Sequence, residues 1–275
     1  VLSALVLTGL EPIWLTPDID EATGVPTGIP VSELERVLDQ KPIALLLTEP
    51  GYLGTISELP ALISKAHENS IPVIIDAAWG GHFGFNANIP QHVMQLGADA
   101  LITSVHKALP GYSASALLLA QGKFLNLARI EQSFETTHTT SPAGAPLASI
   151  DGCRALLETR GDHLTGNLLK YVTDFKRQVQ SHFALDIFLN PEQFAEGRFD
   201  PVKIVLRANL LGLSGVDVEK ELQQANIRVE MADRDTIVFL ATLADNADDF
   251  CVLADALIPI LKSLQGEPRA TQTSL

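Results

Sequence analysis

Cysteine is nearly absent from this chain of 275 residues, since only Cys153 and Cys251 occur and they lie far apart. Two distant thiols provide neither the density of a disulfide scaffold nor the spacing of a metal site, which fits a protein of the reducing cytoplasm. Basic residues are also few, with 19 Lys and Arg against 33 Asp and Glu and a net charge of −14. A surface of that sign repels phosphate backbones, so nucleic acid is excluded as a partner.

Long apolar runs and glycine-rich cofactor motifs are missing too. The opening segment is apolar only as far as Leu10, which is too short to cross a bilayer, and it lacks the basic leader of a signal peptide. No Gly-x-Gly-x-x-Gly follows a predicted strand, and the histidines lack metal-ligand spacing. With 46% hydrophobic and 19% charged residues, the chain is predicted to be globular, without a metal and without a membrane partner.

Strand and helix patterns alternate along the first half of the chain. Apolar strands are predicted at 12–15, 43–48, 73–76, 100–103 and 115–120, and helices at 31–39, 57–69 and 90–96. Ser32 and Glu35 predict a capping box for the first of these helices, and 17–30 is predicted to be a loop. Such alternation predicts an α/β fold with a mostly parallel sheet, whose strand exits share one edge.

The second half is predicted to change character at residue 146. A helical pattern spans 146–183, and it is followed by strands at 203–207, 227–230 and 236–240 and by helices at 216–225 and 247–264. We therefore predict a large domain at 1–145, a bridging helical segment at 146–184, a small C-terminal α/β domain at 185–264 and a frayed polar tail at 265–275.

Two apolar strands of the larger part each end in a chemically active residue. The strand at 73–75 runs into Asp76, and the strand at 100–103 runs into Ser104 and then Lys107. Ligands collect at the carboxyl ends of parallel strands. A buried lysine can form an imine with an aldehyde, and an aspartate can keep a pyridine nitrogen protonated. Together they suggest pyridoxal phosphate, although each alone also fits a solvated lysine or a turn-capping aspartate.

The motifs around these two residues are more specific. They are DAAWGGHF at 76–83, GADA at 97–100 and SVHKALP at 104–110, with LTEPGYLG at 47–54 before them and TTSP at 139–142 after them. In this order they resemble the pyridoxal-phosphate-dependent ornithine/lysine/arginine decarboxylase family. The resemblance implies an aspartate-aminotransferase-like fold, and removal of the α-carboxylate of lysine, ornithine or arginine to give the corresponding amine of polyamine metabolism.

The resemblance also assigns cofactor roles. Lys107 would form the imine with the cofactor, and Asp76 would face its pyridine nitrogen. Ala78 would leave room for the ring, and Ser104 and His106 would lie near the phosphate, for which a hydroxyl and an imidazole are suitable donors.

Other residues are assigned to the substrate side. Trp79 and His82 would line it, and Thr140 and Ser141 would approach the site of a partner subunit in a homodimer or larger homo-oligomer. In the family the loop that cups the phosphate comes before the opening helix. The apolar spacing at the start predicts a helix already under way at Val1, so we expect part of the cofactor cradle upstream and weak cofactor binding by residues 1–275 alone.

Three alanines depart from the family pattern. Ala77 stands where an acidic residue is common, Ala108 where a threonine follows the lysine, and Ala114 where a glutamine is frequent. These changes leave the imine chemistry intact but leave the substrate, and activity itself, open. The alternatives are an aminotransferase or a lyase, which would be distinguished by its product, and a non-catalytic relative that serves assembly or regulation.

Overall fold

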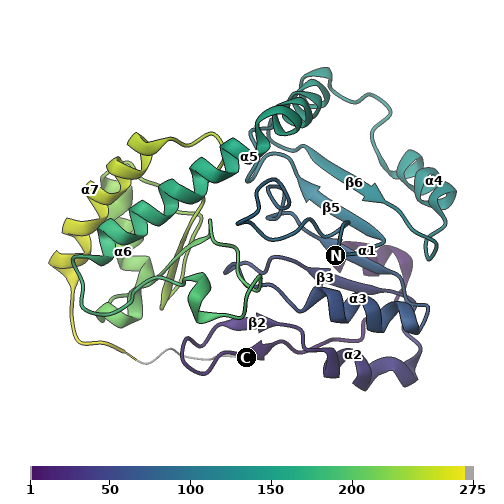
Figure 1. The fold of residues 1–275 in the computed structure, drawn as a ribbon, viewed down its shortest axis with the longest axis horizontal. Coiled ribbons are helices and arrows are strands. Elements are labelled where there is room, and N and C mark those ends of the chain that lie inside the picture. The colour runs from purple at the N-terminus through teal and green to yellow at the C-terminus, as the bar shows by residue number, and fades with distance from the viewer. Residues whose placement is uncertain (1, 270–275) are drawn as a thin grey trace.

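Two main sheets joined by one long helix, with a two-stranded sheet before them in the chain, make up the computed structural model, which describes residues 2–269 (Figure 1). The larger sheet has the order β3-β4-β5-β6. Its strands β3 (Leu45–Thr48), β4 (Val73–Asp76) and β5 (Ala100–Ser104) are parallel, and β6 (Ala116–Ala120) pairs antiparallel with β5. The predicted α/β fold with a mostly parallel sheet is therefore confirmed.

The two faces of this sheet differ in burial. Leu47 and Ile75 point to the face covered by α3 (Leu59–Glu68), and both are buried in the main core with Leu62 of that helix. On the opposite face, Leu46, Ile102 and Leu118 are 42%, 38% and 40% exposed. The continuous apolar sequence of these strands fits burial on both faces, and within the described residues only one face is fully covered.

The smaller sheet is antiparallel and has the order β7-β9-β8. It consists of β7 (Ile204–Arg207), β8 (Met231–Ala232) and β9 (Thr236–Phe239), with the helices α6 (Gly215–Gln224) and α7 (Ala247–Leu264) beside it. Strand β9 is buried throughout, and α7 contributes Phe250, Leu257 and Leu261 to the core.

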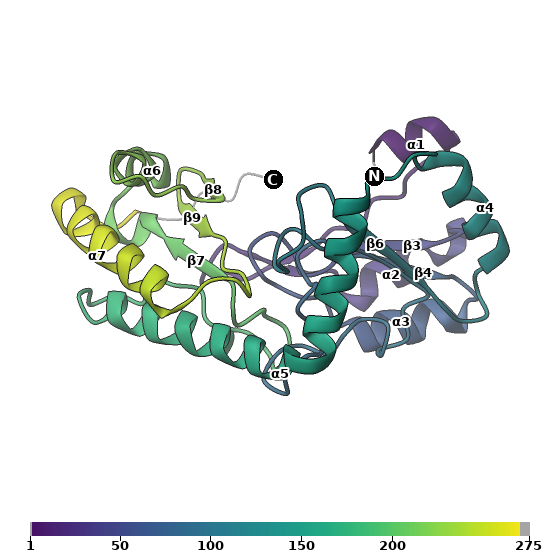
Figure 2. The same cartoon turned by 90° about the horizontal axis from the view of Figure 1, so that it is seen from above.

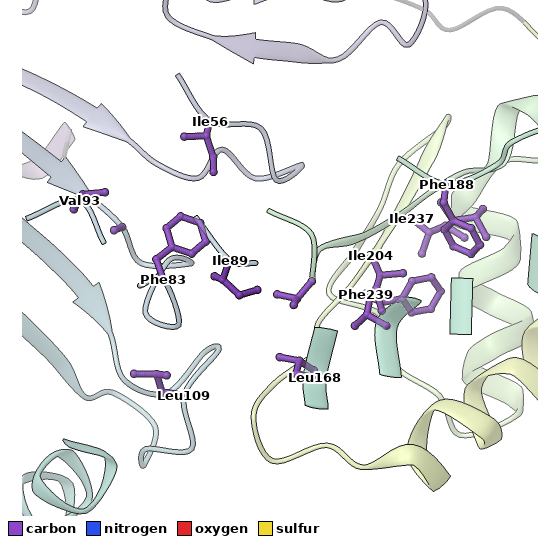
Figure 3. Close-up of a cluster of buried hydrophobic side chains, with 14 of the residues drawn as sticks. Ile56, Phe83, Ile89, Val93, Leu109, Leu168, Phe188, Ile204, Ile237 and Phe239 are labelled. Carbon is purple, nitrogen blue, oxygen red and sulfur yellow. The ribbon is translucent and has the colours of Figure 1, made fainter. Parts of the chain in front are cut away.

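Helix α5 (Gly144–Gln180) runs from the larger sheet to the smaller one (Figure 2). Its buried side chains recur every three or four residues and thus form one stripe along the helix. They include Leu157, Leu168, Val172, Phe175 and Val179. Figure 3 shows the core continuing past Leu168 from Phe83 and Leu109 on one side to Ile204 and Phe239 on the other. The predicted bridging helix is present. The division into domains at 145, 184 and 264 stays a prediction.

The region before β3 differs from the prediction. No strand forms at 12–15, where Trp14 is 66% exposed; instead β1 (Asp18–Ile19) and β2 (Pro26–Gly28) pair within the predicted loop. Helix α1 spans Leu2–Thr8. Helix α2 (Val31–Val37) begins after Pro30 without a side-chain cap, so the capping box is wrong, and it ends in the 3-10 turn η1 (Leu38–Gln40).

Three later elements also differ. Residues 90–96 form turns with i to i+3 hydrogen bonds from Gln95 to His92 and from Leu96 to Val93, so the predicted helix is absent. The strand predicted at 227–230 is displaced to β8. Helix α4 (Leu127–Thr137) was not predicted; the remaining short elements are η2 (Pro191–Gln193) and η3 (Ala208–Leu211).

The segment after α7 is not frayed as far as it is described. Gly266 N donates to Leu211 O at 2.8 Å and Arg269 N donates to Asn209 O at 2.9 Å, because the end of η3 offers these carbonyl groups. Residues 270–275 of the predicted tail, and Val1, lie outside the described residues. Within residues 2–269, no helix is both long and apolar enough to cross a lipid bilayer.

Candidate active site

Asp76 ends β4 at the carboxyl edge of the larger sheet. In the strand register it lies between Thr48 of β3 and Ile102 of β5. Its Oδ1 accepts a hydrogen bond from the backbone N–H of Ala78 at 3.1 Å, and both side chains are half-buried. The parallel strands therefore place a carboxylate at the edge where ligands of such sheets bind.

Lys107 follows β5 at the same edge. The chain turns back there through a hydrogen bond from Gly111 N to Val105 O, and a Cβ at Gly111 would lie only 2.5 Å from that oxygen. The half-buried Lys107 places its Nζ 4.6 Å from the ring centroid of Trp79, which is a cation–π contact. Within residues 2–269 the Lys107 ammonium has no hydrogen bond or ion pair.

Ser104 and His106 both precede the lysine in the sequence. Ser104 is the last residue of β5 and is 9% exposed. His106 Nδ1 lies 2.7 Å from the backbone oxygen of Ser115. Because a carbonyl oxygen can only accept, Nδ1 carries the hydrogen, which leaves Nε2 for another partner.

His82 connects the two sheets. It is 2% exposed, and its Nε2 lies 3.1 Å from Oδ1 of Asp200, which is equally buried. The same oxygen of Asp200 accepts a hydrogen bond from Val202 N at 3.1 Å. His82 thus fixes the segment that leads into β7, a role that its sequence motif did not predict.

A small pocket lies between the two sheets at this point, with about 20 Å³ of space accessible to water, which is room for about one water molecule. One wall comes from the ends of β4 and β5, and the other comes from the segments around β7 and β9. The lining residues are Trp79, His82, Ala108, Asp200, Val202, Lys203, Phe239, Leu240 and Ala241.

Lys203 is a second lysine of the site that sequence reasoning missed. It is 6% exposed, and its Nζ lies 4.0 Å from the centroid of Trp79 and 5.2 Å from that of Tyr52. Burial, together with repulsion by Lys107, lowers the pKa of Lys203 to about 8, although Asp200 and Glu230 oppose this shift. Nothing local in the sequence around Lys203 indicates this position, because the contact joins two distant segments.

Tyr52 completes this aromatic surface. Its ring meets that of Trp79 edge to face at 5.5 Å, and its hydroxyl donates to Glu230 Oε1 at 2.7 Å. Desolvation and the Glu230 carboxylate raise the pKa of Tyr52 to about 12, so the phenol keeps its proton. Tyr52 belongs to the motif at 47–54, and this motif is the feature of the sequence that could have indicated its place in the site.

Residues 1–194 match the family described as Orn/Lys/Arg decarboxylase, major domain. The chain belongs to this family. It is 32% identical over 270 residues to an arginine decarboxylase of Bacillus subtilis, covering 96% of this chain and 55% of that protein. An arginine decarboxylase of Bacillus cereus is 32% identical over 263 residues, with 94% and 57% covered. The chain therefore spans about half the length of these curated relatives.

Solved structures of the decarboxylase family share this fold. Lysine decarboxylase A from Pseudomonas aeruginosa matches with a TM-score of 0.79 at 19% identity, over 95% of this chain and 44% of that one. The constitutive lysine decarboxylase of E. coli matches with a TM-score of 0.73 at 20% identity, over 92% and 42%. An alanine–glyoxylate aminotransferase from Nostoc matches at 0.66 and 16% identity, over 86% and 67%. The aspartate-aminotransferase-like fold is thereby confirmed.

The motif at 97–100, one of those that resemble the decarboxylase family, has a structural role. Asp99 is 2% exposed, and its Oδ2 accepts hydrogen bonds from Val73 N and from His67 Nε2, each at 2.8 Å. These bonds lie at the amino end of β4, opposite the edge that carries Asp76. Asp99 therefore helps to fix the position of β4, the strand whose other end carries Asp76.

Glu49 is a further buried carboxyl group, which lies in the motif at 47–54 but was assigned no role from the sequence. It directly follows β3, is 3% exposed, and accepts a hydrogen bond from Ser57 N at 2.9 Å. Burial raises its pKa to about 7, against the lowering effect of the Ser57 hydrogen bonds and of Arg198. Its side chain thereby connects the end of β3 to the residues just before α3.

Thr140 and Ser141 lie elsewhere. They belong to the exposed connection between α4 and α5, and within the described chain they have no recorded contact with Lys107 or Asp76. Of the departures from the family pattern, Ala77 is buried in the core, Ala108 lines the pocket, and Ala114 is exposed with a φ of 66°. The structure thus brings Lys107, Trp79 and His82 to one place, with Asp76 and Ser104 at the same sheet edge.

Proposed function

We propose that this protein is a pyridoxal-phosphate-dependent decarboxylase of a basic amino acid. The observation that carries the proposal is the placement of Lys107 and Asp76. Lys107, which has no ion pair within residues 2–269, and a carboxylate lie at neighbouring strand ends, beside an aromatic pocket that the second sheet closes. Membership of the decarboxylase family supports the reaction, and the arginine decarboxylases among the relatives support a basic substrate.

The residues present fit this cofactor chemically. The amine of Lys107 suits covalent attachment of an aldehyde, and the carboxylate of Asp76 suits a hydrogen bond to a protonated ring nitrogen. The hydroxyl of Ser104 is a donor for a phosphate, and Nε2 of His106 would be a second donor when the ring carries both protons. Ala78, with its small side chain next to Asp76, would leave room for a flat ring.

The cofactor would supply an electron-accepting ring for the electron pair released when carbon dioxide leaves. The protein would contribute position and protons. Asp76 would hold the proton on the ring nitrogen, Lys107 would bind and release the cofactor through its Nζ, and Trp79 with the second sheet would exclude water from the reacting carbon.

Product analysis with the full-length protein tests the proposal. With pyridoxal phosphate and lysine, ornithine or arginine, we expect carbon dioxide and the matching amine. Lys107→Arg, which keeps the charge but cannot attach the cofactor, should abolish turnover, whereas Lys123→Arg, at an exposed lysine, should not. A keto acid product would instead indicate an aminotransferase, and no product with any of the three would indicate a non-catalytic relative.

Chemical labelling gives a second readout that does not depend on turnover. Borohydride makes the attachment of the cofactor permanent, and peptide mapping should then find the label on Lys107. A label on Lys203 would reverse the roles that we assign to the two lysines.

A further inference from the structure

Lys203 enters the candidate site from the opposite side to Lys107. It immediately precedes β7 of the smaller sheet, yet its Nζ lies 4.0 Å from the Trp79 centroid, while Nζ of Lys107 lies 4.6 Å from the same centroid. The two ammonium groups therefore share one aromatic ring, with the pocket beside them.

The position of Lys203 is held on several sides. Its backbone N–H donates to Asp200 O at 3.0 Å, and Asp200 is itself bound by His82. Its Cβ and Cγ lie against Gly54, where an added Cβ would approach both to 2.9 Å. Gly54 also has a φ of 94°, which L side chains rarely adopt. The glycine of the sequence motif at 47–54 thus makes room for the stem of this lysine.

The ammonium of Lys203 lacks a direct partner within residues 2–269, and the carboxylates of Asp200 and Glu230 act on it only through longer-range attraction. This ammonium has no hydrogen bond and no ion pair to any residue of the described range 2–269, although Lys203 is only 6% exposed. A buried charge without a partner is costly, and an anion entering the pocket would remove that cost. The cationic end of a basic amino acid would be repelled by Lys203, so the carboxylate end is the one that fits this side of the pocket.

We propose that Lys203 binds the carboxylate of the amino-acid substrate. This role rests on the proposed function, and it assigns Lys203 to the orientation of the substrate in that reaction. Decarboxylation removes the negative charge that Lys203 holds, so the contact is stronger before the reaction than after it. It therefore contributes to substrate binding and orientation rather than to breaking the bond.

A matched pair of ligands tests this role. The amino acid and its decarboxylated amine differ only in the carboxylate, and protein with the cofactor fixed to Lys107 by borohydride binds without turnover. In calorimetry, Lys203→Met should weaken binding of the amino acid about 10- to 100-fold, the range of a charge-assisted hydrogen bond, and leave the amine within about twofold. Lys176→Met is the control, because that buried lysine donates to Leu189 O and does not line the pocket.

Steady-state kinetics of the unreduced enzyme should agree, with a rise of KM in Lys203→Met that exceeds the fall of kcat caused by lost orientation. If the variant does not fold, the wild type still decides the question. Its preference for the amino acid over the amine should fall as the pH rises above about 8, where Lys203 loses its charge. Equal weakening of both ligands, or a preference that does not change with pH, would overturn the role. If the unreduced wild type forms no amine from any basic amino acid, the proposed function fails and this role fails with it.

Discussion

Single residues set the pH behaviour of the protein, because three buried ionisable groups respond in opposite directions. Burial lowers the pKa of Lys176 and of Lys203 to about 8, and it raises the pKa of Glu49 to about 7. Between pH 8 and 10.5 the unfolded chain binds more protons at the two lysines, so stability rises with pH there. Between pH 4.5 and 7 the folded chain binds more protons at Glu49, so stability falls as pH rises.

Glu49→Gln isolates the acid-side effect. The amide oxygen can still accept from Ser57 N, but the side chain no longer ionises. We expect the free energy of unfolding at pH 8 to rise by about 3 kcal/mol, and the fall between pH 4.5 and 7 to flatten. Urea unfolding at several pH values measures both, with Glu11→Gln as the exposed control. An unchanged pH profile would show that Glu49 does not titrate in this range.

Asp76→Asn tests the residue that ends β4. A neutral amide no longer favours a protonated ring nitrogen, so turnover should fall by several orders of magnitude while the cofactor still binds. The loss should appear in kcat, with an unchanged circular dichroism spectrum. Asp39→Asn, at an exposed aspartate, is the control. Turnover like that of the wild type in Asp76→Asn would mean that this carboxylate does not face the ring.

At the scale of elements, helix α5 offers two glycines in contrasting surroundings. A Cβ at Gly152 would meet nothing within 4 Å, whereas one at Gly161 would lie 2.8 Å from Cδ1 of Phe85. We expect Gly152→Ala to stabilise the protein by about 0.5–1 kcal/mol through helix propensity. Gly161→Ala should destabilise it by about 1–3 kcal/mol, because the ring and its backbone must shift. Thermal melts of the two variants compare these outcomes directly, and equal gains would show that α5 does not pack closely on Phe85.

Most of the elements near the site could be predicted, because their sequences are locally decisive. Continuous apolar residues specify β3, β4 and β5, and the polar residues after β4 and β5 indicated the edge that carries the chemistry. The prediction failed where hydrogen-bond partners from other segments decide whether a strand forms. Ile227 N bonds back to Leu222 O at the end of α6, so a strand-like sequence at 227–230 does not pair until Glu230 N reaches Val238 O.

At the scale of the whole molecule, the second wall of the pocket could not be predicted. A sequence motif indicates residues 104–107, whereas Lys203 joins the site only because the fold brings the start of β7 beside Trp79. The same limit applies to the partner subunit. Thr140 and Ser141 were predicted to approach another protomer, and the structure leaves their connection exposed.

Complementation between protomers tests that prediction. If the protein is a homodimer with shared sites, co-expressed Lys107→Arg and a Thr140→Ala/Ser141→Ala variant, each inactive alone, should recover about a quarter of the wild-type activity through mixed dimers. Sedimentation velocity of the wild type should show no active monomer. Full activity of the Thr140→Ala/Ser141→Ala variant would remove these residues from the site.

The pocket between the sheets also bears on how the protein unfolds. A ligand that contacts Trp79 and Lys203 binds only when both sheets are in place, so its binding energy stabilises their association rather than either sheet alone. Opening of the chain would then become more cooperative as ligand is added. Amide hydrogen exchange should slow in β5 and β7 together, although these strands belong to different sheets and share no backbone pairing.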